Sequence, residues 1–235
     1  MSQLITDCLN DIFEYLEDDG ATLLSCLLVN RLWCEIAVRI LWRNGRKYNA
    51  TTFITLIACL PNESKKILRN NEINIPTSTS KPPMFNYAAF CKSLSAYSLS
   101  DDIKRLLENQ QSILKQDLYN KTRIVEQEII KLFMDQITSL KSLSIWRCLY
   151  LNTLLTIYPR VKDCLNYLSE LSCDSSTIYS EFTYQLSQVC HNLLSLYITF
   201  NDDIISNGLK ELKILVHSRL SPPLRKNLYL INKTS

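Results

Sequence analysis

Glycine is the residue that this sequence most clearly lacks, with three in 235 positions. Average usage of roughly 7% would supply about sixteen. Phosphate-binding loops, oxyanion turns and tight hairpins all depend on glycine, because its backbone adopts conformations that other residues avoid. The shortage favours a chain of helices and short connections over one built around a glycine-rich catalytic loop.

Catalytic motifs are missing as well. The sequence contains no glycine-rich phosphate loop, no G-x-S-x-G nucleophile elbow and no H-E-x-x-H pair of zinc ligands. Only two histidines are present to act as general bases. We therefore expect a non-catalytic protein.

The nine cysteines are odd in number and form no C-x-x-C pair. Their spacing matches no zinc pattern, so neither a metal nor another cofactor is predicted. Four of them lie among apolar residues and are expected to be small buried hydrophobes in a reducing compartment: Cys8, Cys26, Cys34 and Cys59. The N-terminus lacks the basic start and apolar stretch of a signal peptide. We predict a cytoplasmic and/or nuclear location.

The formal net charge of +3 is unevenly distributed. Residues 1–45 hold three basic and seven acidic side chains, hence about −4, and the remainder carries about +7. A basic body favours an acidic target, although scattered solvated charge would give the same distribution. Tryptophans lie along apolar faces and not among lysines, so no nucleic-acid partner is predicted. No uncharged run is long and apolar enough to indicate a membrane partner.

Three helical patterns follow one another in the first 45 residues. The first places four apolar side chains at the i, i+3, i+4, i+7 spacing of one helix face: Leu9, Ile12, Phe13 and Leu16. Asp7 is predicted to cap the start of this helix, and Gly20 is predicted to end it in the left-handed backbone conformation. A strongly apolar second helix is predicted from about Ala21, and a third after the capping residue Asn30. Such a small unit has more apolar surface than its own core can hide.

These residues resemble the F-box. That motif reads roughly Leu-Pro-x-Glu/Asp-x-Leu, then Ile-Phe-x-x-Leu, then Val-Cys/Asn-Arg-x-Trp. The corresponding segments here are Leu4-Ile5-Thr6-Asp7-Cys8-Leu9, Ile12-Phe13-Glu14-Tyr15-Leu16 and Leu27-Leu28-Val29-Asn30-Arg31-Leu32-Trp33. Ile5 stands where the family usually has proline, which keeps an apolar contact but loses the rigid entry to the helix.

The resemblance implies a binding mode. F-box proteins bind the Skp-type adaptor of a cullin-RING ubiquitin ligase and, through it, the cullin and RING subunits. Carried over by position, the candidate partner contacts or direct supports are Leu4, Ile5, Leu9, Ile12, Phe13, Leu16, Leu28, Val29 and Trp33. Packing inside the chain is the competing explanation for each of them.

Residues 47–120 predict a helical connector. A polar, proline-bearing stretch at residues 70–83 predicts a surface loop. Asn62 is the candidate cap of one helix. Further helical patterns lie near residues 85–94 and 101–107.

The C-terminal half, residues 121–235, repeats the pattern Leu-x-x-Leu-x-apolar. It occurs at residues 140–145, 168–173 and 193–198, with starts 28 and 25 residues apart and a helical stretch before each. A strand and a helix at this period resemble the leucine-rich repeat, whose strand leucines fill the core while variable residues beside them face out. Residues 209–214 fit the pattern but follow too early, and are assigned to a helix. Asn227–Ile231 is a possible last strand.

The predicted fold is therefore α/β and helix-rich. It has a three-helix F-box over residues 1–46, a helical connector over 47–120 and a short leucine-rich-repeat solenoid arc over 121–235. The predicted function is that of a substrate-recognition adaptor of an SCF-type cullin-RING E3 ubiquitin ligase, with the repeats holding a protein target. The alternative is a leucine-rich-repeat interaction scaffold outside any ligase.

Overall fold

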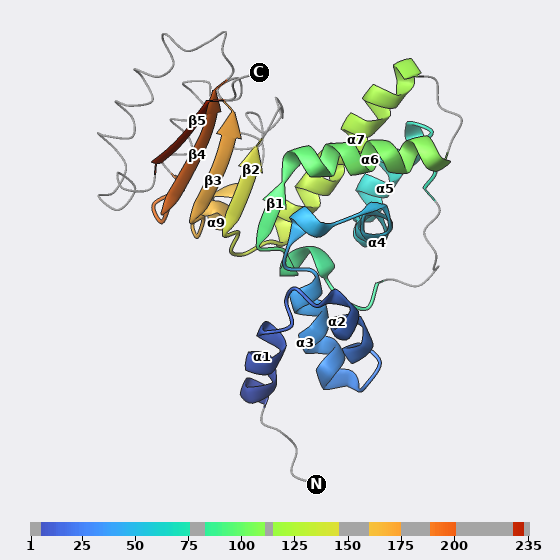
Figure 1. The fold of residues 1–235 in the computed structure, drawn as a ribbon. Helices are drawn as coiled ribbons and strands as arrows, with labels where there is room; N and C mark the ends of the chain where they lie inside the picture. Colours follow the sequence, from blue (N-terminus) through green and yellow to red (C-terminus); the bar gives the residue numbers. More distant parts are fainter. Residues whose placement is uncertain are drawn as a thin grey trace.

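The computed structural model describes residues 6–75, 83–110, 115–145, 160–174, 189–200 and 228–232. Figure 1 shows a group of N-terminal helices that projects from a larger body, in which helices lie beside a parallel sheet. The fold is thus helix-rich α/β, as predicted. No helix among these residues is long and apolar enough to cross a lipid bilayer.

Three helices begin the described chain: α1 (Thr6–Glu14), α2 (Gly20–Cys26) and α3 (Arg31–Leu41). The prediction that Asn30 caps α3 is confirmed, because its side-chain oxygen accepts a hydrogen bond from the Trp33 N–H at 2.9 Å. Such a cap satisfies one of the free N–H groups of the first helical turn.

Two other predicted helix ends are wrong. α1 already begins at Thr6, so Asp7 lies inside its first turn, where a carboxylate still favours the helix dipole. Gly20 does not take a left-handed turn but begins α2. Asp19 caps this helix by accepting a hydrogen bond from the Thr22 N–H at 3.1 Å. The turn between α1 and α2 is therefore shaped by an aspartate, not by the glycine.

The cysteine prediction holds only in part. Cys26 is buried, and Cys34 and Cys59 are half-buried. Cys8 is exposed, contrary to the prediction, because it lies outside the helix face that buries its neighbour Leu9.

The body contains the remaining helices: η1 (Gly45–Lys47), α4 (Ala50–Cys59), α5 (Asn62–Asn70), η2 (Tyr87–Phe90), α6 (Ala96–Gln110), α7 (Lys115–Gln136) and α9 (Val161–Leu165). The prediction that Asn62 caps a helix is wrong, since Pro61 holds the cap position and Asn62 is the first helical residue. The helix predicted near residues 85–94 is also wrong: after the short turn η2 the chain is extended from Ser93, where it pairs with a strand. Residues 76–82 of the predicted polar loop lie outside the described residues.

Five strands form one parallel sheet: β1 (Ser93–Ser95), β2 (Ser142–Ile145), β3 (Glu170–Asp174), β4 (Ser195–Phe200) and β5 (Leu228–Asn232). Each strand pairs with the strands before and after it in the chain. The register places five leucines side by side: Leu94, Leu143, Leu171, Leu196 and Leu228. Each predicted Leu-x-x-Leu-x-apolar segment overlaps a strand of this sheet, and the predicted last strand at Asn227–Ile231 overlaps β5. The segment at residues 209–214 lies outside the described residues.

One buried apolar cluster extends from Tyr48 to Ile198 and joins the body helices to the sheet. α7 contributes Ile129, Ile130 and Phe133 to this cluster, and Ile137 joins it directly after the helix ends. The predicted boundary between connector and repeat region, at residues 120 and 121, lies inside α7, and this division stays a prediction. A second, smaller core belongs to α1, α2 and α3.

Candidate functional site

The apolar side chains of the three N-terminal helices divide into a buried set and an exposed set. The buried set fills the small core: Leu9, Phe13, Leu23, Cys26, Ile36, Ala37 and Ile40. Phe13 is 1% exposed and meets Trp33 edge-on, with ring centroids 5.1 Å apart and an interplanar angle of 86°. Aromatic pairs prefer this arrangement, so the contact fixes α1 against α3.

The exposed set consists of Ile12, Tyr15, Leu24, Leu28 and Val29. Ile12 lies in α1 and Tyr15 directly follows its last residue, whereas Leu28 and Val29 lie in the turn after α2. Leu28 is 89% exposed. Burying an aliphatic side chain of this size is worth roughly 1.5–3 kcal/mol, so these exposed positions are candidates for contact with a partner.

The turn that carries Leu28 and Val29 has a fixed backbone. The Leu28 N–H donates to the Ser25 carbonyl at 3.1 Å, and the Val29 N–H donates to the Cys26 carbonyl at 3.3 Å. Asn30, the next residue, caps α3. A surface that is ordered before binding loses less conformational freedom when a partner docks.

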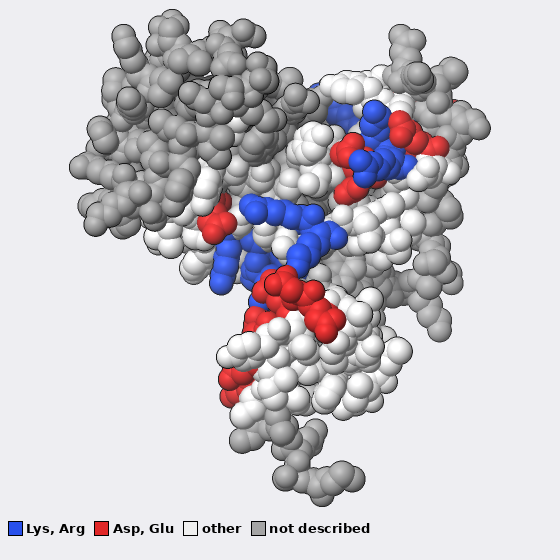
Figure 2. All heavy atoms as spheres, viewed as in Figure 1, with Lys and Arg blue, Asp and Glu red and all other residues white. Residues whose placement is uncertain are grey.

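Charged residues line the edge of this unit next to the body. Arg43 binds both carboxylate oxygens of Glu14 and approaches Glu17 at 3.7 Å, and Lys47 contacts Asp18 at 2.8 Å. The Arg43 hydrogen bond lowers the pKa of the Glu14 carboxyl. Figure 2 shows this acidic edge facing basic side chains of the body, above a largely uncharged surface of the N-terminal helices.

The nine residues predicted to contact or support the partner fall into four groups. Ile12, Leu28 and Val29 are exposed. Leu9 and Phe13 are buried in the small core, where they support the surface from behind. Leu16 and Trp33 are half-buried against that core. Leu4 and Ile5 lie outside the described residues. No partner is present, so each contact stays a prediction.

Two exposed apolar residues were missed in the sequence. Tyr15 is 91% exposed and Leu24 is 57% exposed. Helical spacing could have revealed both, because Tyr15 follows Ile12 by three residues and Leu24 precedes Leu28 by four.

The decisive comparison concerns this same segment. Residues 6–46 match the model of the F-box-like family. The F-box-like domain thus comprises α1, α2, α3 and the start of η1. Such a domain implies a Skp-type adaptor as its binding partner.

No curated protein and no solved structure matches the chain. Neither the F-box-like match nor these comparisons support leucine-rich repeats in the C-terminal half. Among the residues that the structure describes, no group of three or more His, Cys, Asp or Glu side chains could hold a metal ion.

Proposed function

We propose that this chain is a non-catalytic substrate-recognition adaptor of an SCF-type cullin-RING ubiquitin ligase. Its F-box-like domain binds the Skp-type adaptor, which brings the cullin and RING subunits. Its C-terminal half binds a protein target. The chain acts by holding the target at a high effective concentration near the charged ubiquitin carrier, and supplies no chemistry of its own.

The observation that carries the proposal is the exposed apolar surface of the F-box-like domain. Ile12, Leu28 and Val29 occupy positions that the F-box resemblance assigns to adaptor contacts, and all three are exposed. A few such anchors supply most of the affinity of a typical interface.

The order of the sheet supports a repeat architecture for the target-binding half. Consecutive strands pair in parallel without skipping a neighbour, and one leucine of each strand lies in a common row. Stacked repeats of one strand and one helix produce this arrangement, and they build extended binding surfaces. We therefore propose leucine-rich repeats as the architecture of this region.

A binding assay between the full chain and a purified Skp-type adaptor tests the proposal. The test variant is the double substitution Ile12→Asp and Leu28→Asp, which places charge on exposed positions and leaves the small core intact. The matched control is Ile67→Asp with Met84→Asp, two exposed apolar residues outside the F-box-like domain.

We expect the wild-type chain and the control to bind equally well, and the test variant to bind about a hundredfold more weakly. If the folded wild-type chain does not bind the adaptor, the chain is instead an interaction scaffold outside the ligase. Equal losses of affinity in both double variants would show that Ile12 and Leu28 do not form the adaptor contact.

A further inference from the structure

Three basic side chains gather at the edge of the sheet where β1 and β2 begin. Arg46, on η1, donates from Nη2 to the Ser142 Oγ at 2.6 Å. Lys92 precedes β1 and donates from Nζ to the Ser139 Oγ at 2.5 Å. Lys141 holds the same position before β2, so the parallel pairing of these strands brings the two lysines together. Arg46, Lys92 and Lys141 are named the basic cluster below.

No carboxylate of the described chain forms an ion pair with the basic cluster. The charge of Lys141 contributes to lowering the pKa of the Glu14 carboxyl, but both oxygens of that carboxyl are bound by Arg43. Glu170, the strand neighbour of Ser142, forms no ion pair there either. Arg46 and Lys92 are thus held by neutral hydroxyl groups, and no described carboxylate pairs with the positive charge of the cluster.

Repulsion within the basic cluster is visible at Lys92. Burial, followed by the neighbouring charges of Lys141 and Arg43, lowers the pKa of the Lys92 ammonium group. An anion placed between these side chains would relieve the repulsion, and a carboxylate, which carries the opposite charge, attracts an ammonium or guanidinium group more strongly than a neutral hydroxyl does.

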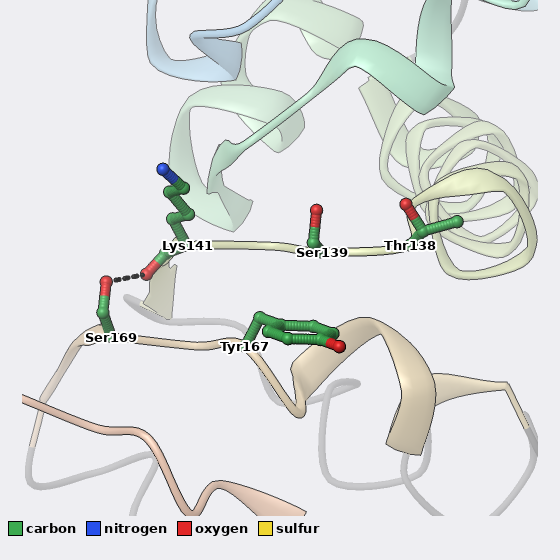
Figure 3. A pocket seen from close by; sticks show the side chains of 5 residues that line it. All are labelled: Thr138, Ser139, Lys141, Tyr167 and Ser169. Atoms are coloured by element: carbon green, nitrogen blue, oxygen red, sulfur yellow. Dashed lines mark hydrogen bonds between the residues drawn. The ribbon is translucent and has the colours of Figure 1, made fainter.

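An open pocket of about 720 Å³ adjoins the basic cluster (Figure 3). Its lining consists of Thr138, Ser139, Lys141, Tyr167 and Ser169. Figure 3 shows the side chains of Lys141 and Ser139 extending to one side of their segment, with the Tyr167 ring on its other side. The Ser169 hydroxyl donates to the Lys141 carbonyl at 3.0 Å and so fixes the backbone that carries this lysine. The ammonium groups of Lys92 and Lys141 and the hydroxyl of Ser139 are donors of the kind that a carboxylate requires.

We propose that the basic cluster and the adjoining pocket bind an acidic peptide segment of the target, through its Asp and Glu side chains. This inference rests on the proposed function and specifies which kind of segment the adaptor recognises. Charge complementarity carries it, because complementary charge steers association and selects partners. Arg46 belongs to the residues matched by the F-box-like model, so the segment would bind directly beside the ligase-binding domain.

Fluorescence anisotropy with the full chain tests the inference. The probes are a labelled Glu-rich peptide, its counterpart with Gln at every Glu, and a neutral peptide carrying one phosphoserine. The test variant is Lys141→Glu, at an exposed position. The matched control is Lys66→Glu, which makes the same charge change on an exposed lysine of α5.

We expect the wild-type chain to bind the Glu-rich peptide and not the Gln peptide. Lys141→Glu should weaken this binding about tenfold, because it removes one favourable pair and adds a repulsion, whereas Lys66→Glu should change it less than about twofold. Equal losses in both variants would mean that only net charge matters and would overturn the site. Binding of the Gln peptide as well, binding of the phosphoserine peptide alone, or no binding at all would overturn it too.

Adaptor binding measured on the same samples separates the inference from the proposed function. Lys141→Glu should bind the Skp-type adaptor as the wild-type chain does. A wild-type chain that fails to bind the adaptor but binds the Glu-rich peptide through Lys141 would support the acidic-peptide site and refute the ligase role.

Discussion

Glu14 and Arg43 join the end of α1 to the residues that follow α3, with two guanidinium nitrogens donating to the two carboxylate oxygens. This two-armed geometry is the strongest that an arginine and a carboxylate can make. The Glu14 side chain is 48% exposed and that of Arg43 is 29% exposed, so water screens part of the attraction. The pair closes the F-box-like domain at the side that faces the body.

The substitution Glu14→Gln should lower stability by about 1 kcal/mol or less at neutral pH, because exposed ion pairs contribute little. The pKa of Glu14 is lowered below its usual value of 4.5, first by the Arg43 hydrogen bond. A lowered folded-state pKa stabilises the protein fully above the usual value, and this stabilisation is lost as pH falls through the folded pKa. Urea unfolding of both proteins should therefore show a difference at pH 7 that shrinks in acid below 4.5.

Asp11→Asn is the matched control, since this exposed carboxylate lies beyond the first turn of α1 and forms no ion pair with a described residue. It should leave the unfolding free energy unchanged across the same pH range. A difference for Glu14→Gln that stayed constant into acid would show that its charge is not the cause.

Phe13 and Ile12 are neighbours in sequence with opposite environments, 1% and 49% exposed. Phe13→Ala should destabilise the F-box-like domain by about 3–5 kcal/mol, because it opens a cavity and removes the contact with Trp33. Ile12→Ala should change stability by no more than about 0.5 kcal/mol. Circular dichroism during urea unfolding gives both values, and comparable losses would contradict the separation into core and surface.

The helices of the F-box-like domain could be predicted because their signals are local. An i, i+3, i+4 spacing and the cap at Asn30 both act within one helical turn. The exposure of Ile12 beside buried Phe13 could not be predicted in the same way. It depends on where Trp33 of α3 packs, which is a contact between residues twenty apart in the chain.

The strand β1 was missed for a more specific reason. Residues 91–96, Cys-Lys-Ser-Leu-Ser-Ala, share the central Lys-Ser-Leu-Ser of residues 140–145. Cysteine and alanine replace the outer leucine and isoleucine, so the segment no longer fits the Leu-x-x-Leu-x-apolar form. Pairing with β2 decides its conformation, because strand formation depends on neighbours more than on local preference.

Gly45 lies where the chain passes closest to β1. A Cβ atom at this position would lie 2.6 Å from the Ser93 carbonyl oxygen. The Ser93 backbone is held there because it forms a parallel β-bridge with Asn44. Gly45→Ala should therefore cost about 1–3 kcal/mol in unfolding free energy. Gly20→Ala, where nothing lies within 4 Å of the new Cβ, should cost nothing or stabilise α2 by up to about 1 kcal/mol. Thermal unfolding of the two variants compares them directly, and a loss at Gly20 as large as that at Gly45 would show that crowding is not the reason.

Leu143 belongs to the leucine row and is 2% exposed, with Leu94 and Leu171 as its neighbours across the sheet. Leu143→Ala should destabilise the body by about 2–5 kcal/mol, because the rigid strands on either side cannot close the cavity. Ser144, the next residue, points to the opposite face of the strand, so Ser144→Ala should change stability by less than about 0.5 kcal/mol. Urea unfolding measures both changes. The reverse order of effects would mean that the register of β2 is shifted by one residue, since such a shift exchanges the two faces of a strand.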